Sequence, residues 1–260
     1  MSRESTSKTV FVATALAVVC SVLVSTAAVG LRDMQQANKL LEKQKNILMA
    51  AGLYEPDINV TEAFKACKPK VVNLETGEYV PEDEVDPATY DQREAASNPE
   101  LSVKIPEEKD LPRIGRRAKY ALVYSVEKDG QLDQIILPIK GNGLWSTMYG
   151  FLALDKDGET VRGVTFYEHA ETAGLGGEVS NPKWNAKWVG KKIYGSAHEV
   201  EFRVMKGEVV AGSKNEDSSV DGLSGATLTS NGVTNLMQYW LGEQGFGPYL
   251  EKIRKGGGNG

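Results

Sequence analysis

The chain has 260 residues, 41% of them hydrophobic, and its 35 acidic side chains exceed its 30 basic ones for a formal net charge of −5. This composition can build a substantial core, which excludes wholesale disorder, and without a basic excess we expect no nucleic-acid partner. Two cysteines and two histidines are too few for a disulfide scaffold, a four-thiolate cluster or an ordinary zinc site. We therefore predict no metal site.

A long apolar segment follows a short N-terminal flank, residues 1–8. Thr9 to Leu31 contains 23 residues without a single charge. As a helix it would be about 35 Å long, enough for a hydrocarbon core of about 30 Å. A buried helix of a soluble protein would show a polar face, and a cleaved signal peptide has a shorter apolar core. The length favours an uncleaved, single-pass transmembrane helix over residues 9–31, in which Cys20 acts as a small apolar residue.

A connecting region is predicted over residues 32–118. Leucine and isoleucine recur at helical spacing across residues 32–54, where Gly52 is the expected stop, and residues 60–67 suggest a second, short helix. Residues 75–110 carry 12 acidic and 3 basic side chains together with four prolines. This composition is typical of an irregular, solvated excursion rather than of a core.

Beyond Lys119 the sequence becomes rich in alternating, strand-like runs, which predicts a separate domain over residues 119–260. Two such runs flank Lys128-Asp129-Gly130, a hairpin signal, and a second hairpin is expected over residues 149–167. A third is expected over residues 201–210, and a helical pattern runs from Thr229 to Leu241. These elements predict an α+β domain with a mostly antiparallel sheet and flanking helices.

The densest group of polar side chains lies just before that last helix. The run from Asp221 to Ser230 reads DGLSGATLTS and combines four hydroxyl side chains with Gly222 and Gly225. Amides at a helix start are unsatisfied, the helix dipole favours an anion there, and glycines allow close approach, so the run suits a phosphate. Plain N-capping by serine or threonine is the alternative, and these residues alone leave both open. A nucleotide P-loop is excluded, because no Gly-Lys-Ser/Thr is present.

Two further glycine-containing segments carry candidate ligand contacts. The run HAETAGLGG, residues 169–177, places a carboxylate and a hydroxyl, Glu171 and Thr172, beside the apolar Leu175 in a flexible loop. Residues 143–150 hold Trp145 among hydroxyl side chains; it can stack on a flat ligand, although tryptophan at a strand start is more often core. Two histidines do not assemble a hydrolytic triad, so we assign no catalytic residue.

Together the three segments resemble the covalent FMN-binding domain family. Residues 221–227 match its attachment signature, and the Gly-Leu-Trp and His-x-Glu-Thr-x-Gly-Leu-Gly segments match its flavin pocket. In that family a separate flavin transferase esterifies a threonine with the FMN phosphate, so the resemblance implies covalent FMN on Thr227. With its apolar N-terminal segment, the whole chain resembles the C-subunit family of bacterial sodium-translocating NADH:quinone oxidoreductases. The G-subunit family of Rnf-type electron-transport complexes is the nearest alternative.

The resemblance also implies the remaining pocket. Trp145 and Leu175 would form an apolar wall for the isoalloxazine, with Glu171 and Thr172 bonding the ring edge or the ribityl chain. Asp221 and Gly222 belong to the attachment motif, Asp221 serving the transferase reaction. The other cofactor-binding residues would be Gly176, Ser224, Gly225, Ala226, Leu228 and Thr229. The sequence does not show whether Lys206 or His169 contacts the flavin.

The implied function is that of an internal electron carrier. A membrane-anchored flavoprotein would accept an electron from one redox centre of a multi-subunit complex and pass it to another, without binding NADH or quinone. The resemblance places its FMN domain on the periplasmic side of the bacterial inner membrane, while the Lys and Arg counts around the apolar segment leave the side open. Its partners would be other membrane subunits and the flavin transferase. A flavin-free, anchored binding module and a free flavin reductase are the competing hypotheses.

Overall fold

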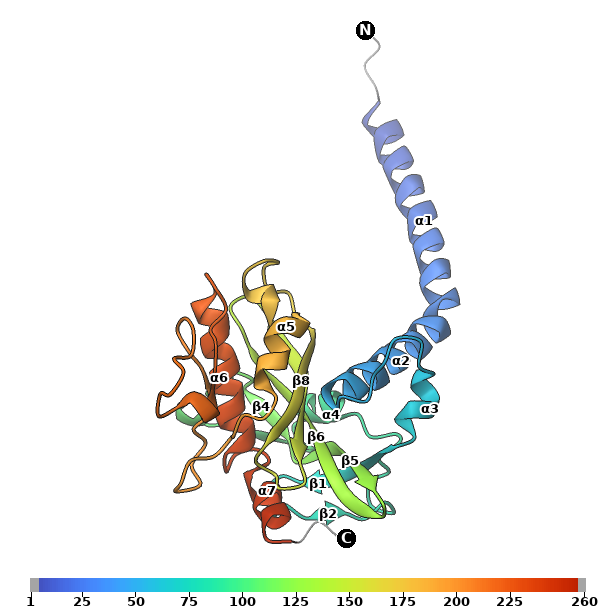
Figure 1. The fold of residues 1–260 in the computed structure, drawn as a ribbon. Helices are drawn as coiled ribbons and strands as arrows, with labels where there is room; N and C mark the ends of the chain where they lie inside the picture. Colours follow the sequence, from blue (N-terminus) through green and yellow to red (C-terminus); the bar gives the residue numbers. More distant parts are fainter. Residues whose placement is uncertain (1–4, 257–260) are drawn as a thin grey trace. The chain divides into compact units, whose positions relative to one another are not determined.

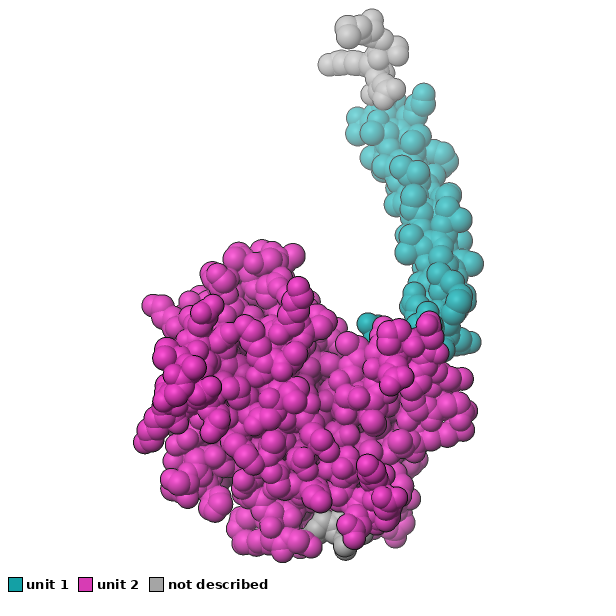
Figure 2. All heavy atoms as spheres, viewed as in Figure 1, with its two compact units in different colours: residues 1–44 teal, residues 45–260 magenta. Residues whose placement is uncertain are grey.

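The computed structural model describes residues 5–256 (Figure 1). The chain forms two compact units, Met1–Gln44 and Lys45–Gly260 (Figure 2). The first unit is helical, and the second contains the strands and the remaining helices.

The first unit consists of helix α1 (Thr6–Gly30) and most of helix α2 (Arg32–Ala50). Helix α1 has no buried residue, and an 18-residue window of it reaches a mean hydropathy of 2.3. Its length and composition suffice to cross a membrane. The last turns of α2 belong to the second unit, where Ile47 and Leu48 are fully buried. Gly52 (φ +68°) follows α2, and its amide bonds the carbonyl of Met49, which confirms the predicted stop.

The second unit is built on a six-stranded, wholly antiparallel sheet in the order β2-β1-β5-β6-β7-β8. Its strands are β1 (Cys67–Asn73), β2 (Tyr79–Val80), β5 (Tyr120–Lys128), β6 (Gln131–Asn142), β7 (Thr147–Asp155) and β8 (Val161–Glu168). The β5–β6 hairpin turns at Asp129 and Gly130, which both have positive φ, and β7 and β8 form the second predicted hairpin. The predicted α+β class with a mostly antiparallel sheet is confirmed.

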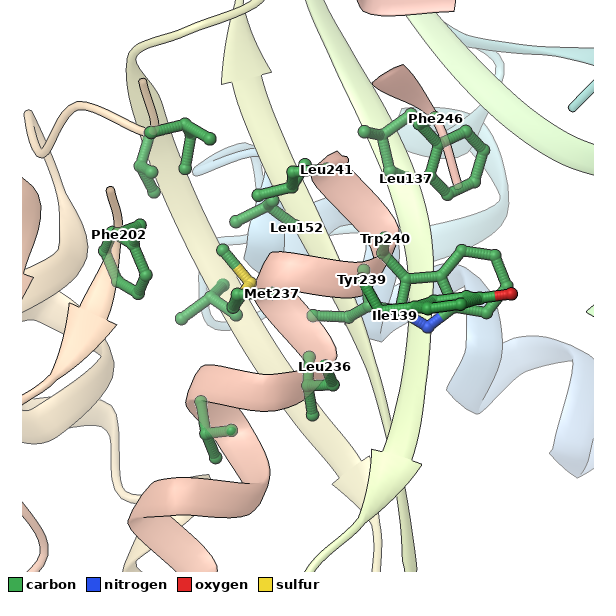
Figure 3. Packing of buried hydrophobic residues seen from close by; sticks show 14 of the residues in the cluster. Leu137, Ile139, Leu152, Phe202, Leu236, Met237, Tyr239, Trp240, Leu241 and Phe246 are labelled. Atoms are coloured by element: carbon green, nitrogen blue, oxygen red, sulfur yellow. The ribbon is translucent and has the colours of Figure 1, made fainter. Parts of the chain in front are cut away.

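Helices cover both faces of this sheet. On one face α6 (Thr227–Leu241) packs its buried Leu236 and Met237 among the side chains of β6 and β7, as Figure 3 shows. The indole N–H of Trp240 donates to the carbonyl of Lys140 on β6 at 2.6 Å. The opposite face packs against the end of α2, where Ile47 lies in the cluster that contains Phe151. The C-terminal helix α7 (Gly247–Arg254) and the short α5 (Pro182–Asn185) complete the helical layer on the α6 side.

Residues 60–118 contain several regular elements, and those within residues 75–110 exceed what the acidic, proline-rich composition predicts. They contain α3 (Val60–Phe64), α4 (Gln92–Ser97), β3 (Ser102–Lys104), the 3-10 turn Glu107–Lys109 and β4 (Arg116–Ala118), and strands β1 and β2 of the main sheet. The prediction of an irregular excursion is therefore wrong for α4. Its amides are capped by the side chain of Asp91, and Ala95 and Ala96 bury its apolar side.

Two expectations near the C-terminal end of the domain are also corrected. No hairpin forms over residues 201–210: β9 (Arg203–Val204) pairs in parallel with β10 (Ser219–Val220). The reason is a remote partner, since the amide of Met205 bonds the carbonyl of Val220. Helix α6 begins at Thr227 rather than Thr229, because the first helical hydrogen bond runs from the amide of Ser230 to the carbonyl of Ala226.

Candidate functional site

Three segments that are distant in sequence meet at the N-terminal end of α6. They are the β6–β7 loop (residues 143–146), the loop after β8 (residues 169–177) and the run that leads into α6 (residues 221–229). Glu171 is the residue that connects them. Its carboxylate accepts hydrogen bonds from the amides of Leu144 (3.2 Å), Trp145 (2.8 Å) and Ser146 (3.2 Å) and from the hydroxyl of Thr229 (2.5 Å).

Glycines permit this close convergence. A Cβ atom at Gly176 would lie 2.5 Å from Oγ1 of Thr229 and 2.8 Å from Oε2 of Glu171. At Gly143 it would lie 2.6 Å from Oε1 of Glu171. Both glycines are therefore needed for packing around one carboxylate, which is a more specific reason than loop flexibility.

The carboxylate of Glu171 is charged although it is buried. Only 8% of the residue is exposed, and burial by itself raises the pKa of a carboxyl group. The hydroxyl of Thr229 and the three backbone amides outweigh that effect, so the pKa of Glu171 lies below its ordinary value. Glu171 therefore remains a hydrogen-bond acceptor throughout the neutral range.

The first turn of α6 presents unsatisfied amides. Ala226 precedes the helix in a non-helical conformation, and no side chain caps it. Among residues 5–256 no hydrogen-bond partner is found for the amides of Thr227, Leu228 and Thr229. Plain N-capping, the alternative left open by the sequence, is thus not what this run does. Three free donors at the positive end of the helix dipole suit an anion.

The four hydroxyl side chains of this run fall into two pairs. Thr229 is 1% exposed and donates to Glu171, and Ser230 is buried with its Oγ accepting from the amide of Leu223 at 3.1 Å. Ser224 and Thr227 are exposed. Only the second pair can therefore meet a ligand without breaking the local structure.

Apolar side chains are exposed beside these amides. Leu144 and Trp145 come from the β6–β7 loop, Leu175 from the loop after β8 and Leu228 from the first turn of α6, and Trp145 is 70% exposed. A Cβ atom at Gly225 (φ +69°) would lie 2.9 Å from Cδ2 of Leu175, which places this leucine directly beside the run. Large apolar side chains that are exposed together, rather than singly, mark binding surfaces. Next to an anion site they suit a flat, aromatic ligand with an anionic end.

Asp221 and Gly222 hold the run in place. Asp221 accepts from the amide of Val209 at 2.7 Å and pairs with Nζ of Lys187 at 2.5 Å, and these contacts outweigh burial and lower its pKa. Its carbonyl accepts from the indole of Trp184 at 2.8 Å. A Cβ atom at Gly222 would clash with the carbonyl oxygen of Met205, so this glycine is needed for close approach.

The remaining candidates lie around this centre. The carbonyl of Thr172 accepts from the amides of Leu175 and Gly177, which closes the loop after β8, while its side chain is exposed. His169 contacts the hydroxyl of Ser180 at 3.3 Å. Lys206 is exposed and lies next to Gly207, whose carbonyl bonds the amide of Gly222.

Sequence reasoning did not find the supporting residues Lys187, Val209 and Ser146. Lys187 and Val209 hold Asp221, and the hydroxyl of Ser146 accepts from the amide of Ala170 at 2.6 Å. Their partners come from remote segments, so no local spacing could have indicated them.

A separate open cavity of about 910 Å³ lies at the other end of α6, lined in part by Tyr194 and Arg254.

The fold and the site define an FMN-binding domain. Residues 143–242 match the FMN-binding domain family, and this range contains the three segments that meet at Glu171.

Proteins that are similar over the full length of the chain show which family of FMN-binding proteins it belongs to. The chain is 48% identical to the C-subunit of the Na(+)-translocating NADH-quinone reductase of Vibrio anguillarum over 99% of both chains, and 48% identical to that of Pseudomonas aeruginosa over 98% of both. The crystal structure of Shewanella oneidensis NqrC superposes with a TM-score of 0.77 at 37% identity, covering 84% of this chain and 99% of that one. The C-subunit from Parabacteroides distasonis superposes with a TM-score of 0.64 at 30% identity, covering 85% and 96%. The chain belongs to the C-subunit family of Na(+)-translocating NADH-quinone reductases, which confirms the resemblance seen in the sequence.

Proposed function

We propose that this chain is the membrane-anchored flavoprotein subunit of a Na(+)-translocating NADH-quinone reductase and carries electrons through FMN bound at the start of α6. Family membership and the FMN-binding match support the role. The described residues fit the cofactor, because unsatisfied amides for a phosphate lie beside exposed apolar side chains for a flat ring. FMN supplies reversible one- and two-electron chemistry, and the protein supplies binding and orientation.

Thr227 is the residue we propose as the covalent acceptor, in a phosphoester with FMN. The single observation that carries this choice is the division of the hydroxyls: Thr229 is buried against Glu171, whereas Thr227 is exposed. Thr227 is also the first residue of α6. A phosphate on its side chain would keep a negative charge near the positive end of the helix, worth about 0.3–1 kcal/mol.

The other pocket residues would divide the cofactor between them. The exposed side chains of Trp145, Leu175 and Leu228 would contact the isoalloxazine, and Thr172 would supply a hydroxyl at its edge. The phosphate would lie against the turn formed by Ser224, Gly225 and Ala226, which continues into the unsatisfied amides of α6.

Flavin fluorescence in a denaturing gel tests the linkage. The full chain is co-expressed with a flavin transferase as wild type, Thr227→Ala and Ser224→Ala. We expect a fluorescent band for wild type and Ser224→Ala and none for Thr227→Ala. A band that persists in Thr227→Ala and disappears in Ser224→Ala would move the linkage to Ser224. A colourless wild-type chain would remove the carrier function and favour the flavin-free binding module.

The anchor and partners complete the proposal. We propose that α1 spans the bacterial inner membrane once, that the FMN domain lies on the periplasmic side, and that the chain assembles with other membrane subunits. The length and hydropathy of α1 support the membrane span, and the complex named for the relatives supports the partner subunits. The periplasmic side rests on the family resemblance of the sequence. A C-terminal alkaline phosphatase fusion, which is active only outside the cytoplasm, should be active. An inactive phosphatase fusion together with an active cytoplasmic reporter would reverse the orientation.

A further inference from the structure

The carboxylate of Glu171 has no acceptor position left for a ligand. A carboxylate has about four lone-pair positions, and both oxygens of Glu171 already share four donors. Glu171 is also only 8% exposed, so it lies beneath the exposed residues of the site. A direct bond to the flavin ring or the ribityl chain would have to displace one of these donors.

We propose that Glu171 is a positioning residue, which holds the Trp145 loop and the first turn of α6 in one arrangement. This inference rests on the proposed function, because the two elements that it joins are those that we assign to the ring and to the phosphate. Glu171 therefore acts on the flavin through Trp145 and through the α6 start, and does not contact the cofactor itself.

The backbone contacts explain how a buried residue controls an exposed one. Trp145 is anchored through its amide, which makes the 2.8 Å bond to Glu171, while its indole stands free of the core. The neighbouring amides of Leu144 and Ser146 bond the same carboxylate, so the tip of the loop is fixed at three consecutive residues. Hydrogen bonds to a charged acceptor are the stronger kind, so the loop is held firmly.

The same carboxylate reaches the helix through one side chain. The hydroxyl of Thr229 lies in the first turn of α6 and donates to Oε2 of Glu171, the oxygen that also accepts from Leu144. The rest of α6 is held separately by the packing of residues such as Leu236 and Trp240 against the sheet. Loss of the Glu171 contacts should therefore loosen the site without unfolding the domain.

Amide hydrogen exchange on the flavin-free full chain tests this arrangement directly. In Glu171→Gln the side-chain amide offers one oxygen in place of two, so we expect the amides of residues 144–146 to exchange roughly tenfold faster than in wild type. The matched control is Glu168→Gln, three residues earlier, because Glu168 is exposed and pairs with Arg93 instead. Unchanged exchange at residues 144–146 in Glu171→Gln would overturn the proposal.

A second variant separates positioning from a simple loss of stability. Thr229→Val removes the hydroxyl donor and keeps the shape of the side chain. If Glu171→Gln does not fold, Thr229→Val tests the same contact. On the flavin-loaded chain, both single variants should keep the covalent band and show a faster decay of flavin fluorescence anisotropy than Glu168→Gln. Because both act on one contact network, the double variant should be no more mobile than Glu171→Gln alone. Additive effects, or wild-type anisotropy in both variants, would contradict the proposal.

Hydrogen exchange and the fluorescent gel band test the role of Glu171 and the carrier function separately. If the wild-type chain never carries covalent flavin, the carrier function fails while the hydrogen-exchange arm still decides the role of Glu171. If the wild-type chain is flavinylated and exchange at residues 144–146 does not respond to Glu171→Gln, the positioning role fails and the carrier function stands.

Discussion

Thr229 donates its hydroxyl to the carboxylate of Glu171 at 2.5 Å, across 58 residues of sequence, while Thr227, two positions earlier, is exposed. This contact divides two chemically identical side chains into a structural one and an available one. Of the two threonines, only Thr227 is therefore available for the linkage that we propose.

Thr229→Val should lower stability and leave the covalent flavin in place. The variant deprives a buried, charged carboxylate of one donor, which costs about 1–3 kcal/mol. Thermal unfolding of the full chain in detergent measures the loss, and the fluorescent gel band measures the linkage. Disappearance of the band in a folded Thr229→Val chain would contradict our choice of Thr227.

Trp145→Ala should affect the flavin far more than the fold. Trp145 is 70% exposed, so removal of its indole should change the free energy of unfolding by no more than about 0.5 kcal/mol. A ring that stacks on an indole has its emission quenched, so loss of Trp145 should brighten the covalent flavin. The matched comparison is Trp240→Ala, which removes a buried indole and should cost about 3–5 kcal/mol. Unchanged emission in Trp145→Ala would remove this indole from the flavin wall.

Gly176→Ala should damage the centre of the site. Its Cβ would lie 2.5 Å from Oγ1 of Thr229 and 2.8 Å from Oε2 of Glu171, so these groups must separate, at a cost of about 1–3 kcal/mol. Gly174, two residues earlier, has φ +75° and no atom within 4 Å of the corresponding position, so Gly174→Asn should be tolerated far better. Equal thermal stability of the two variants would contradict the close packing around the carboxylate.

Acid should destabilise the domain partly through Glu171. Its pKa is lowered on folding by the Thr229 hydroxyl and the loop amides, against the effect of burial. Its stabilising contribution is therefore fully present above the unfolded pKa of about 4.3 and is lost as pH falls through the lower, folded pKa. The free energy of unfolding should fall less steeply below about pH 4.3 in Glu171→Gln than in wild type. Parallel pH profiles in urea titrations would show that Glu171 does not contribute.

The sequence predicts most local parts of this structure, although it does not predict α4, whose cap Asp91 is local. Its failure at β9 concerns a remote partner. The β5–β6 turn at Asp129-Gly130 and the stop at Gly52 depend on glycine conformations that are visible in the sequence. The sequence does not reveal that β9 forms no hairpin, because the partner of β9 is β10, which follows a long irregular segment.

In the site, too, the residues can be predicted from the sequence but their remote contacts cannot. The residues of the three segments could be named from a family resemblance, yet the four donors of Glu171 could not, since three are backbone amides that any sequence would supply. The side-chain identity of Leu144 or Ser146 says nothing of where its amide points. Only the fold, which brings the β6–β7 loop over the loop after β8, creates that acceptor site.

Lys187 should matter for maturation more than for stability. It pairs with Asp221 of the attachment motif at 2.5 Å, but its own side chain is half exposed, so Lys187→Ala should cost no more than about 1 kcal/mol of stability. The lost pair frees Asp221 from one of its two side-chain contacts, the other being the amide of Val209. A less firmly held motif should be flavinylated more slowly by the transferase, measured as the rate at which the fluorescent band appears. Lys183→Ala changes an exposed lysine one helical turn earlier in α5 and serves as the control. If both variants are flavinylated at the wild-type rate, the Lys187–Asp221 pair does not position residues 221–229, and the contacts of Asp221 with Val209 and Trp184 suffice.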